Sequence, residues 1–303
     1  MAGTVLPLLL AGWFASALGS DSAGWSLMAA VLAASCIVPT LVTWRVTRGL
    51  ERFHERSSSS VRELWRSAFS NRSLLYALAA FCGVYAALNV QSAVAVYFMI
   101  SRLGFSEELS SLAFLLNLTV ALVAVPIVSV VARRAGKPRT LGYLMLVWAM
   151  LAACYLFVSK DNSWLFWILT GATGVPLTAG VMLTWAMIPD CTEIDEFRTG
   201  ERREGLYYGL VTFAQQGVVA VLLWVVGVAL SLSGYVATAA QSPSAMWTIR
   251  LLMSGGTAVC AVLAAWMAFR QPMTSSKHAA LRRAVEAKQA GETYEVDAFA
   301  DLL

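Results

Sequence analysis

Long apolar runs dominate this 303-residue sequence and constrain its fold more than any other feature. A membrane-spanning helix needs about 20 mostly apolar residues, and eight segments have this character or come close to it. They are Thr4–Leu18, Gly24–Trp44, Leu74–Ile100, Ser110–Ala132, Leu141–Val158, Leu165–Ile188, Leu206–Gly234 and Met246–Phe269. Because backbone groups in lipid need internal partners and no alternating barrel pattern is present, the runs must be helices. The sequence therefore predicts an all-α membrane protein with about eight transmembrane helices.

Composition supports this class. Hydrophobic residues make up 58% of the chain and charged residues 13%, with a mean hydropathy of +0.67. A soluble domain would have roughly 45–50% apolar and about 25% charged residues. Soluble enzymes are therefore excluded, and we expect no catalytic residues. The five cysteines and the two distant histidines, His54 and His278, offer no adequate ligand set for a metal, and no cofactor motif stands out.

Basic residues alternate between the loops and so predict the orientation. Of the 22 Lys and Arg, 19 fall in the second, fourth and sixth connections or after the last span. Positively charged loops favour the cytoplasm, so both termini are expected there. The net charge of +4 then reflects this bias, and no nucleic-acid partner is expected. An alternative for Thr4–Leu18 is a signal peptide, because Ala15-Ser16-Ala17 is typical of a cleavage site.

A charged segment, 188–205, interrupts the apolar pattern. It carries nine charges between two spans, acidic residues first and basic residues after them. We expect a short solvated turn whose ion pairs tie helix ends together and break when the helices rock. Its candidate gating residues are Asp190, Glu193, Asp195, Glu196, Arg198, Arg202 and Arg203. The alternative is a solvated turn that serves only membrane topology.

Together with Leu206-Tyr207-Tyr208-Gly209, this segment resembles the signature of the glycoside–pentoside–hexuronide:cation symporters, the melibiose-permease-like branch of the major facilitator superfamily. The matching positions are Asp190, Glu196, Thr199, Gly200, Arg202, Glu204 and Gly205. Residues 133–139 resemble the basic turn after the family's helix eight, and residues 63–71 its approach to helix seven. Two departures are Glu193-Ile194, where Asp-Tyr is usual, and Gln216, where a lysine is common in helix eleven.

The resemblance implies that the eight spans correspond to helices five to twelve of a partial major facilitator fold. Residues 1–44 would be two helices of the N-terminal bundle, 45–73 a cytoplasmic linker, 74–269 a six-helix C-terminal bundle, and 270–303 a cytoplasmic tail. Within the tail, residues 275–290 are expected to form a helix capped by Ser275 or Ser276. The implied function is secondary active sugar or glycoside transport with Na⁺ or H⁺ in a bacterial inner membrane, by an N-terminally truncated chain.

The span interiors contain no Asp or Glu, although a coupled cation or proton needs such a group. In the resembling family, those carboxylates lie in the first four helices. Uncharged polar residues remain as candidates for a sugar pathway, and the alternative is that they serve only as packing contacts between helices. They are Tyr85, Asn89, Gln91, Asn117, Trp185, Gln215 and Gln216. A non-transporting remnant or a membrane partner subunit is the alternative function.

Overall fold

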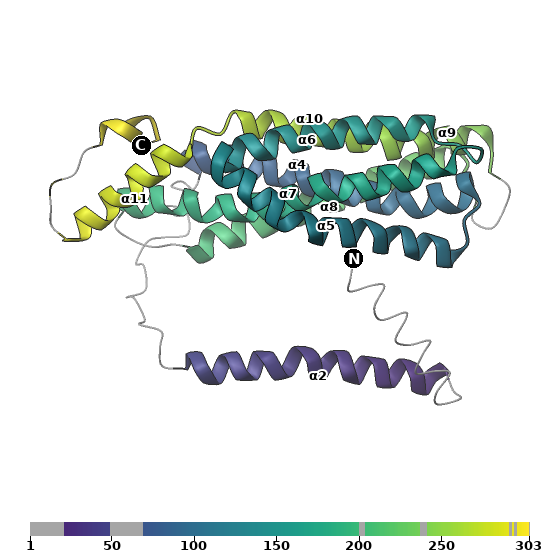
Figure 1. Cartoon of the computed structure of the whole chain (residues 1–303), viewed down its shortest axis with the longest axis horizontal. Helices are drawn as coiled ribbons and strands as arrows, with labels where there is room; N and C mark the ends of the chain where they lie inside the picture. Colours follow the sequence, from purple (N-terminus) through teal and green to yellow (C-terminus); the bar gives the residue numbers. More distant parts are fainter. Residues whose placement is uncertain are drawn as a thin grey trace. The chain divides into compact units, whose positions relative to one another are not determined.

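The computed structural model describes residues 21–48, 69–199, 204–236, 241–290, 293 and 296–302, and this part of the chain is almost wholly helical (Figure 1). Seven of its helical stretches are long and apolar enough to cross a membrane. They are Ser22–Thr47, Arg72–Leu103, Glu108–Ala135, Lys137–Phe157, Ser163–Arg198, Glu204–Leu232 and Pro243–Phe269. Each overlaps an expected span over most of its length, so these seven predicted spans are confirmed. The expected first span, Thr4–Leu18, lies outside the described residues.

The chain divides into two compact units, Met1–Ser58 and Ser59–Leu303. In the first unit, the described helix is α2 (Asp21–Thr47), which carries apolar side chains on all sides. Thr40, Thr43 and Thr47 each donate a hydroxyl hydrogen bond to the carbonyl four residues earlier, which satisfies these donors within the helix. The assignment of residues 1–44 and of the linker to domains remains a prediction, since residues 49–68 are not described.

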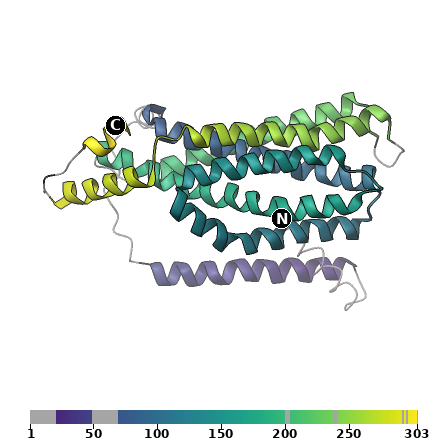
Figure 2. The same ribbon diagram turned by 45° about the horizontal axis from the view of Figure 1, so that its top comes forward.

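The second unit is a bundle of long helices that run along a common direction (Figures 1 and 2). They are α4 (Arg72–Tyr97), α5 (Glu107–Ala135), α6 (Lys137–Cys154), α7 (Ser163–Thr199), α8 (Glu204–Leu232), α9 (Pro243–Leu251) and α10 (Thr257–Phe269). Short π-helical or 3₁₀ segments extend three of them: η1 (Phe98–Leu103) follows α4, η2 (Tyr155–Phe157) follows α6, and η3 (Leu252–Gly256) joins α9 to α10. Helices α9 and α10 therefore form one continuous span, Pro243–Phe269.

Small residues allow the bundle helices to approach closely. Helices α4 and α6 each pack against both α7 and α10, while α5 packs on α7 and α8 packs on α4. At Gly174 of α7, an added Cβ would lie only 2.7 Å from the carbonyl oxygen of Asn117 in α5. Close backbone contact of this kind is a common source of packing energy between helices in lipid, where no hydrophobic driving force acts between them.

Burial within the second unit is uneven. In the most apolar stretch of the α4 and α7 spans, 50% and 56% of the residues are buried. In the corresponding stretch of the α5 and α8 spans, only 17% and 11% of the residues are buried. The uncovered sides of α5 and α8 carry large apolar side chains, among them Ile127, Phe213 and Trp224. These two sides are suited to lipid or to further membrane helices.

Helix α7 is longer than the sequence predicted. Residues 188–205 were expected to form a solvated turn, yet α7 continues through its acidic half to Thr199. The expectation of a turn was wrong for this half because Cys191, Ile194 and Phe197 recur every three residues and are buried along one side of the helix. Residues 200–203 lie outside the described part.

The chain ends in helix α11 (Ser275–Ala290) and a short 3₁₀ segment, η4 (Asp297–Leu302). The predicted bounds of α11 are confirmed, but the expected cap was wrong: the hydroxyl of Thr274 accepts from the backbone N–H of Lys277 at 3.4 Å. Leu281 and Phe299 are fully buried in a small apolar cluster with Ile194 and Phe197 of α7. The end of the chain therefore packs against the extension of α7.

Candidate functional site

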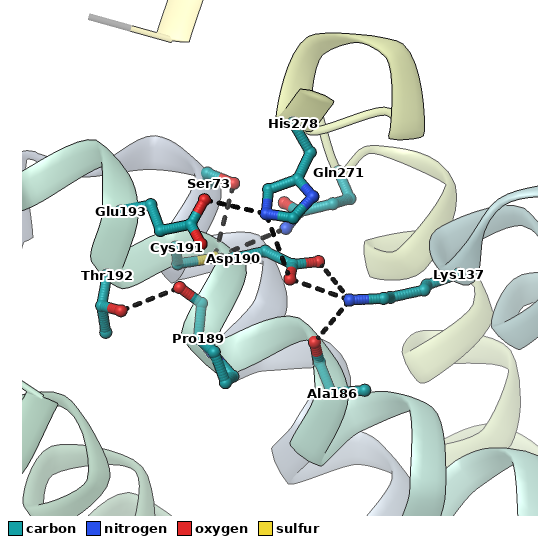
Figure 3. Close-up of polar contacts among 10 residues, drawn as sticks. All are labelled: Ser73, Lys137, Ala186, Pro189, Asp190, Cys191, Thr192, Glu193, Gln271 and His278. Carbon is teal, nitrogen blue, oxygen red and sulfur yellow. Dashed lines mark hydrogen bonds and ion pairs between the residues drawn. The ribbon is translucent and has the colours of Figure 1, made fainter. Parts of the chain in front are cut away.

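A charged cluster joins α6, α7 and α11 at the end of the bundle where α7 terminates (Figure 3). Lys137 is the first residue of α6, directly after the turn at Gly136, and Asp190 lies on α7. Lys137 Nζ donates to both carboxylate oxygens of Asp190, at 2.8 and 2.7 Å, and to the carbonyl of Ala186 at 2.9 Å. The Asp190 side chain is only 14% exposed, so this ion pair is partly removed from water.

His278 of α11 adds a titratable group to the cluster. Its Nε2 lies 2.9 Å from Glu193 Oε2 and 3.6 Å from Asp190 Oδ1, as ion-pair contacts rather than well-aligned hydrogen bonds. The contact with Glu193 raises the pKa of His278, burial opposes this, and the negative charge of Asp190 raises it further. Protonated His278 would therefore hold two carboxylates of α7 against the C-terminal helix.

Beside this cluster, uncharged groups surround the fully buried Cys191. Asn71 donates to the carbonyl of Cys191 at 3.0 Å and also caps α4 by accepting from the N–H of Leu74. Ser73 Oγ lies 3.5 Å from Cys191 Sγ, and the amide of Gln271, just after α10, lies 3.8 Å from the same sulfur. The ends of α4 and α10 are thus tied to α7 at the level of the charged cluster.

The structure brings some of the predicted gating residues together and separates others. Asp190 and Glu193 meet at His278, whereas the guanidinium of Arg198 donates to the carbonyl of Leu302 at 3.2 Å. Asp195 is 3% exposed, and Glu196 is half-buried. Arg202 and Arg203 lie outside the described residues. A gating role for the whole set remains a prediction.

Sequence reasoning missed Lys137, His278, Asn71 and Gln271 as members of this site. Lys137 lay in the basic stretch 133–139, which was used only to predict the orientation and for its resemblance to the family's turn after helix eight. His278 was considered only as a metal ligand. The available signal was its position near the start of a predicted helix that follows the last span.

A second polar feature is an aromatic cluster on α4, α7 and α8. Trp185 Nε1 donates to the hydroxyl of Tyr85 at 2.8 Å. Tyr85 stacks on Phe81 with ring centroids 4.6 Å apart, and Trp185 stacks on Tyr208 at 6.1 Å. Tyr85, Trp185 and Tyr208 are half-buried, so their rings are partly accessible. Aromatic faces with polar edges can stack on a sugar ring and bond to its hydroxyls.

The remaining pathway candidates differ in their surroundings. Asn117 bridges α5 and α7 by donating to the carbonyl of Thr170 and to the hydroxyl of Thr173. Gln91 accepts a hydrogen bond from Trp148 Nε1 at 2.6 Å. Asn89 donates to the carbonyl of Tyr85 in its own helix. Gln215 is half-buried and Gln216 exposed, both on the little-covered helix α8. Asn117 and Gln91 thus already make contacts between helices, whereas Gln215 and Gln216 remain more accessible.

A long-helix bundle that crosses the membrane several times and carries a half-buried polar site is the architecture of a polytopic membrane transporter. The sequence model described as "MFS/sugar transport protein" matches residues 1–275. The chain therefore belongs to the MFS/sugar transport protein family, within the major facilitator superfamily that its charged segment resembles.

Curated relatives agree with this assignment. The chain is 28% identical to an uncharacterized symporter of Synechocystis sp. over 228 residues, which cover 73% of this chain and 42% of the relative. It is 29% identical to the uncharacterized symporter YnaJ of Bacillus subtilis over 248 residues, 80% and 52% of the two chains. It is 28% identical to a putative sulfoquinovose importer of Escherichia coli over 208 residues, 68% and 44%. These are transporters and not enzymes, and the chain spans about half of their length.

Proposed function

We propose that this chain acts in secondary active transport of a sugar or glycoside with Na⁺ or H⁺, and that the aromatic cluster of Tyr85, Trp185 and Tyr208 contacts the sugar. The observation that carries the proposal is the Trp185–Tyr85 hydrogen bond between half-buried rings, which presents an apolar face and a polar edge together. Two further relatives are named as a raffinose carrier protein and a glucuronide carrier protein homolog, and these names favour a carbohydrate substrate.

The charged cluster is proposed to act as a latch in the same cycle. Rocking of one helical bundle against another needs contacts at helix ends that hold one state and release in the other. The pairing of Asp190 with Lys137 and of Glu193 with His278 ties α6, α7 and α11 together within the second unit, and making or breaking these pairs would set the arrangement of the helix ends on this side of the rocking bundle. By the distribution of basic loops, this end would face the cytoplasm of a bacterial cell.

Sugar binding tests the proposal most directly. In nanodiscs, the purified 303-residue chain is expected to bind a sugar from a panel that includes raffinose, a glucuronide and sulfoquinovose. Trp185→Phe keeps an aromatic ring but removes the N–H donor, and we expect it to weaken binding by about five- to tenfold. Trp247→Phe, at an exposed tryptophan of α9, is the matched control. Equal affinities for the two variants would refute the assignment of the aromatic cluster.

A partner subunit is the second candidate function, and the uncovered apolar sides of α5 and α8 favour it. The acidic residues of the α7 span lie near its end, from Asp190 onward, and the apolar stretches predicted as spans contain no Asp or Glu, so we expect no gradient-driven uptake by this chain alone in proteoliposomes. Saturable uptake under a Na⁺ or proton gradient would overturn this expectation. Absence of sugar binding, combined with stable co-purification with another membrane protein, would favour the partner subunit.

A further inference from the structure

A separate basic pocket of about 440 Å³ lies where the turn between α5 and α6 meets the end of α10 and the start of α11. Arg133, Arg134 and Arg139 line one side of it, and Gln271, Thr274 and Ser276 line another. No carboxylate is among the lining residues, and none of the three arginines forms an ion pair within the described part of the chain. The pocket therefore holds uncompensated positive charge.

Two helix N-termini add to this charge. Helix α6 begins at Lys137 after Gly136 and has no side-chain cap, although Pro138 lacks an N–H, and α11 begins next to Thr274, which accepts from the N–H of Lys277. Gly136 and Pro138 line the pocket on one side, and Thr274 and Ser276 on the other. The first turn of a helix carries unpaired N–H groups and a partial positive charge, which favours anions. Guanidinium groups and helix N-termini together match a phosphate group.

Gln271 points to a further property of the ligand. Its side chain is buried, with the residue 7% exposed, and its Nε2 faces the sulfur of Cys191. Its Oε1 is buried without a hydrogen-bond partner, although the residue lines the pocket. A buried acceptor without a partner is costly and calls for a donor. A turn of the Gln271 side chain toward the pocket would bring Oε1 within reach of such a donor, and a phosphate ester that carries neighbouring hydroxyl groups would provide it.

The pocket also lies at the depth of lipid headgroups. The spans that form it end at Ala135, Lys137 and Phe269. Phe269 lines the pocket, is 43% exposed and meets the exposed ring of Tyr143 at a centroid distance of 5.2 Å. An apolar surface thus continues from the pocket along α6 and α10, where an acyl chain can pack. We propose that this pocket binds a phosphoglycerol group, carried either by an anionic membrane lipid or by soluble glycerol phosphate.

Native mass spectrometry of the full chain in a neutral detergent tests the proposal. Phosphatidylglycerol, phosphatidylcholine and glycerol 3-phosphate are added in turn and the retained ligands are counted. The double variant Arg133→Gln/Arg139→Gln is expected to lower phosphoglycerol affinity by about tenfold or more. The matched control, Arg72→Gln/Arg283→Gln, removes two exposed charges that do not line the pocket and should change affinity by less than about twofold.

The competing sources give different results. If excess glycerol 3-phosphate leaves phosphatidylglycerol bound, the lipid is the ligand, and if it displaces the lipid while binding by itself, the soluble ester is. Gln271→Leu should reduce the preference for phosphatidylglycerol over phosphatidic acid, which lacks the glycerol headgroup hydroxyls. Equal binding by both double variants would overturn the proposal. If the pocket double variant does not fold, Arg139→Gln and Gln271→Leu provide the same comparison singly.

Discussion

Replacing Lys137 with methionine is expected to loosen the end of the bundle at α6 and α7. Lys137 makes three close contacts, two with the Asp190 carboxylate and one with the Ala186 carbonyl, and Met keeps most of the stem but none of the donors. An exposed ion pair contributes about 0–1 kcal/mol, and breaking a buried one costs about 3–5 kcal/mol. Lys137 is 35% exposed and Asp190 14%, so the pair lies between these limits, and we expect a loss of about 2 kcal/mol.

The buried thiol of Cys191 reports this loosening directly. It is fully buried next to Asp190, so a maleimide reacts with it only when this end opens. A loss of about 2 kcal/mol corresponds to about a thirtyfold faster labelling rate. The assay needs a background in which the other cysteines are replaced by alanine, namely Cys36, Cys82, Cys154 and Cys260.

Two comparisons decide whether the ion pair is the cause. Lys160→Met removes an exposed lysine from the loop before α7, at the opposite end of the helix, and should leave the labelling rate unchanged. Adding Asp190→Asn to Lys137→Met should recover part of the loss, since no buried carboxylate is then left without its lysine. Parent-like labelling of Lys137→Met, or strictly additive effects in the double variant, would refute the reasoning.

The pH, one close helix contact and one helix cap provide further tests. The Glu193 contact raises the pKa of His278 above its ordinary value of 6.5, so the stabilisation by protonated His278 is complete below about pH 6.5 and is lost as the pH rises through the raised pKa. Over that rise in pH, the melting temperature of the parent should therefore fall more than that of His278→Gln. Gly174→Ala places a Cβ 2.7 Å from a backbone oxygen of α5 and should cost about 1–3 kcal/mol in unfolding free energy, whereas Gly171→Ala, with its nearest atom at 3.7 Å, should be tolerated. Asn71→Ala removes the α4 cap and the bond to α7, and should lower stability by about 1–2 kcal/mol in thermal unfolding; parent-like melting would contradict this.

The extension of α7 shows how one sequence signal can mask another. Nine charges in 18 residues favoured a turn, because such density is rare in this chain. The three-residue spacing of Cys191, Ile194 and Phe197 was equally visible and favoured a helix. The helix forms because α11 and η4 cover this apolar side, through Leu281 and Phe299. Charge density by itself therefore did not locate the end of the helix.

The sequence by itself determined the spans and the C-terminal helix. Lipid exposure selects for about 20 consecutive apolar residues whatever their neighbours, so composition along the chain was enough to locate them. The bounds of α11 likewise followed from a local pattern, and the family followed from the charged segment and its flanking residues.

Only the tertiary structure decided which charged groups meet. Lys137 and Asp190 are 53 residues apart, and they pair because the turn at Gly136 places the start of α6 beside α7. His278 joins them because α11 packs back onto the extended α7. An ion pair of this kind needs its atoms within about 4 Å. Such a distance depends on how whole helices pack, and no local pattern of residues encodes it.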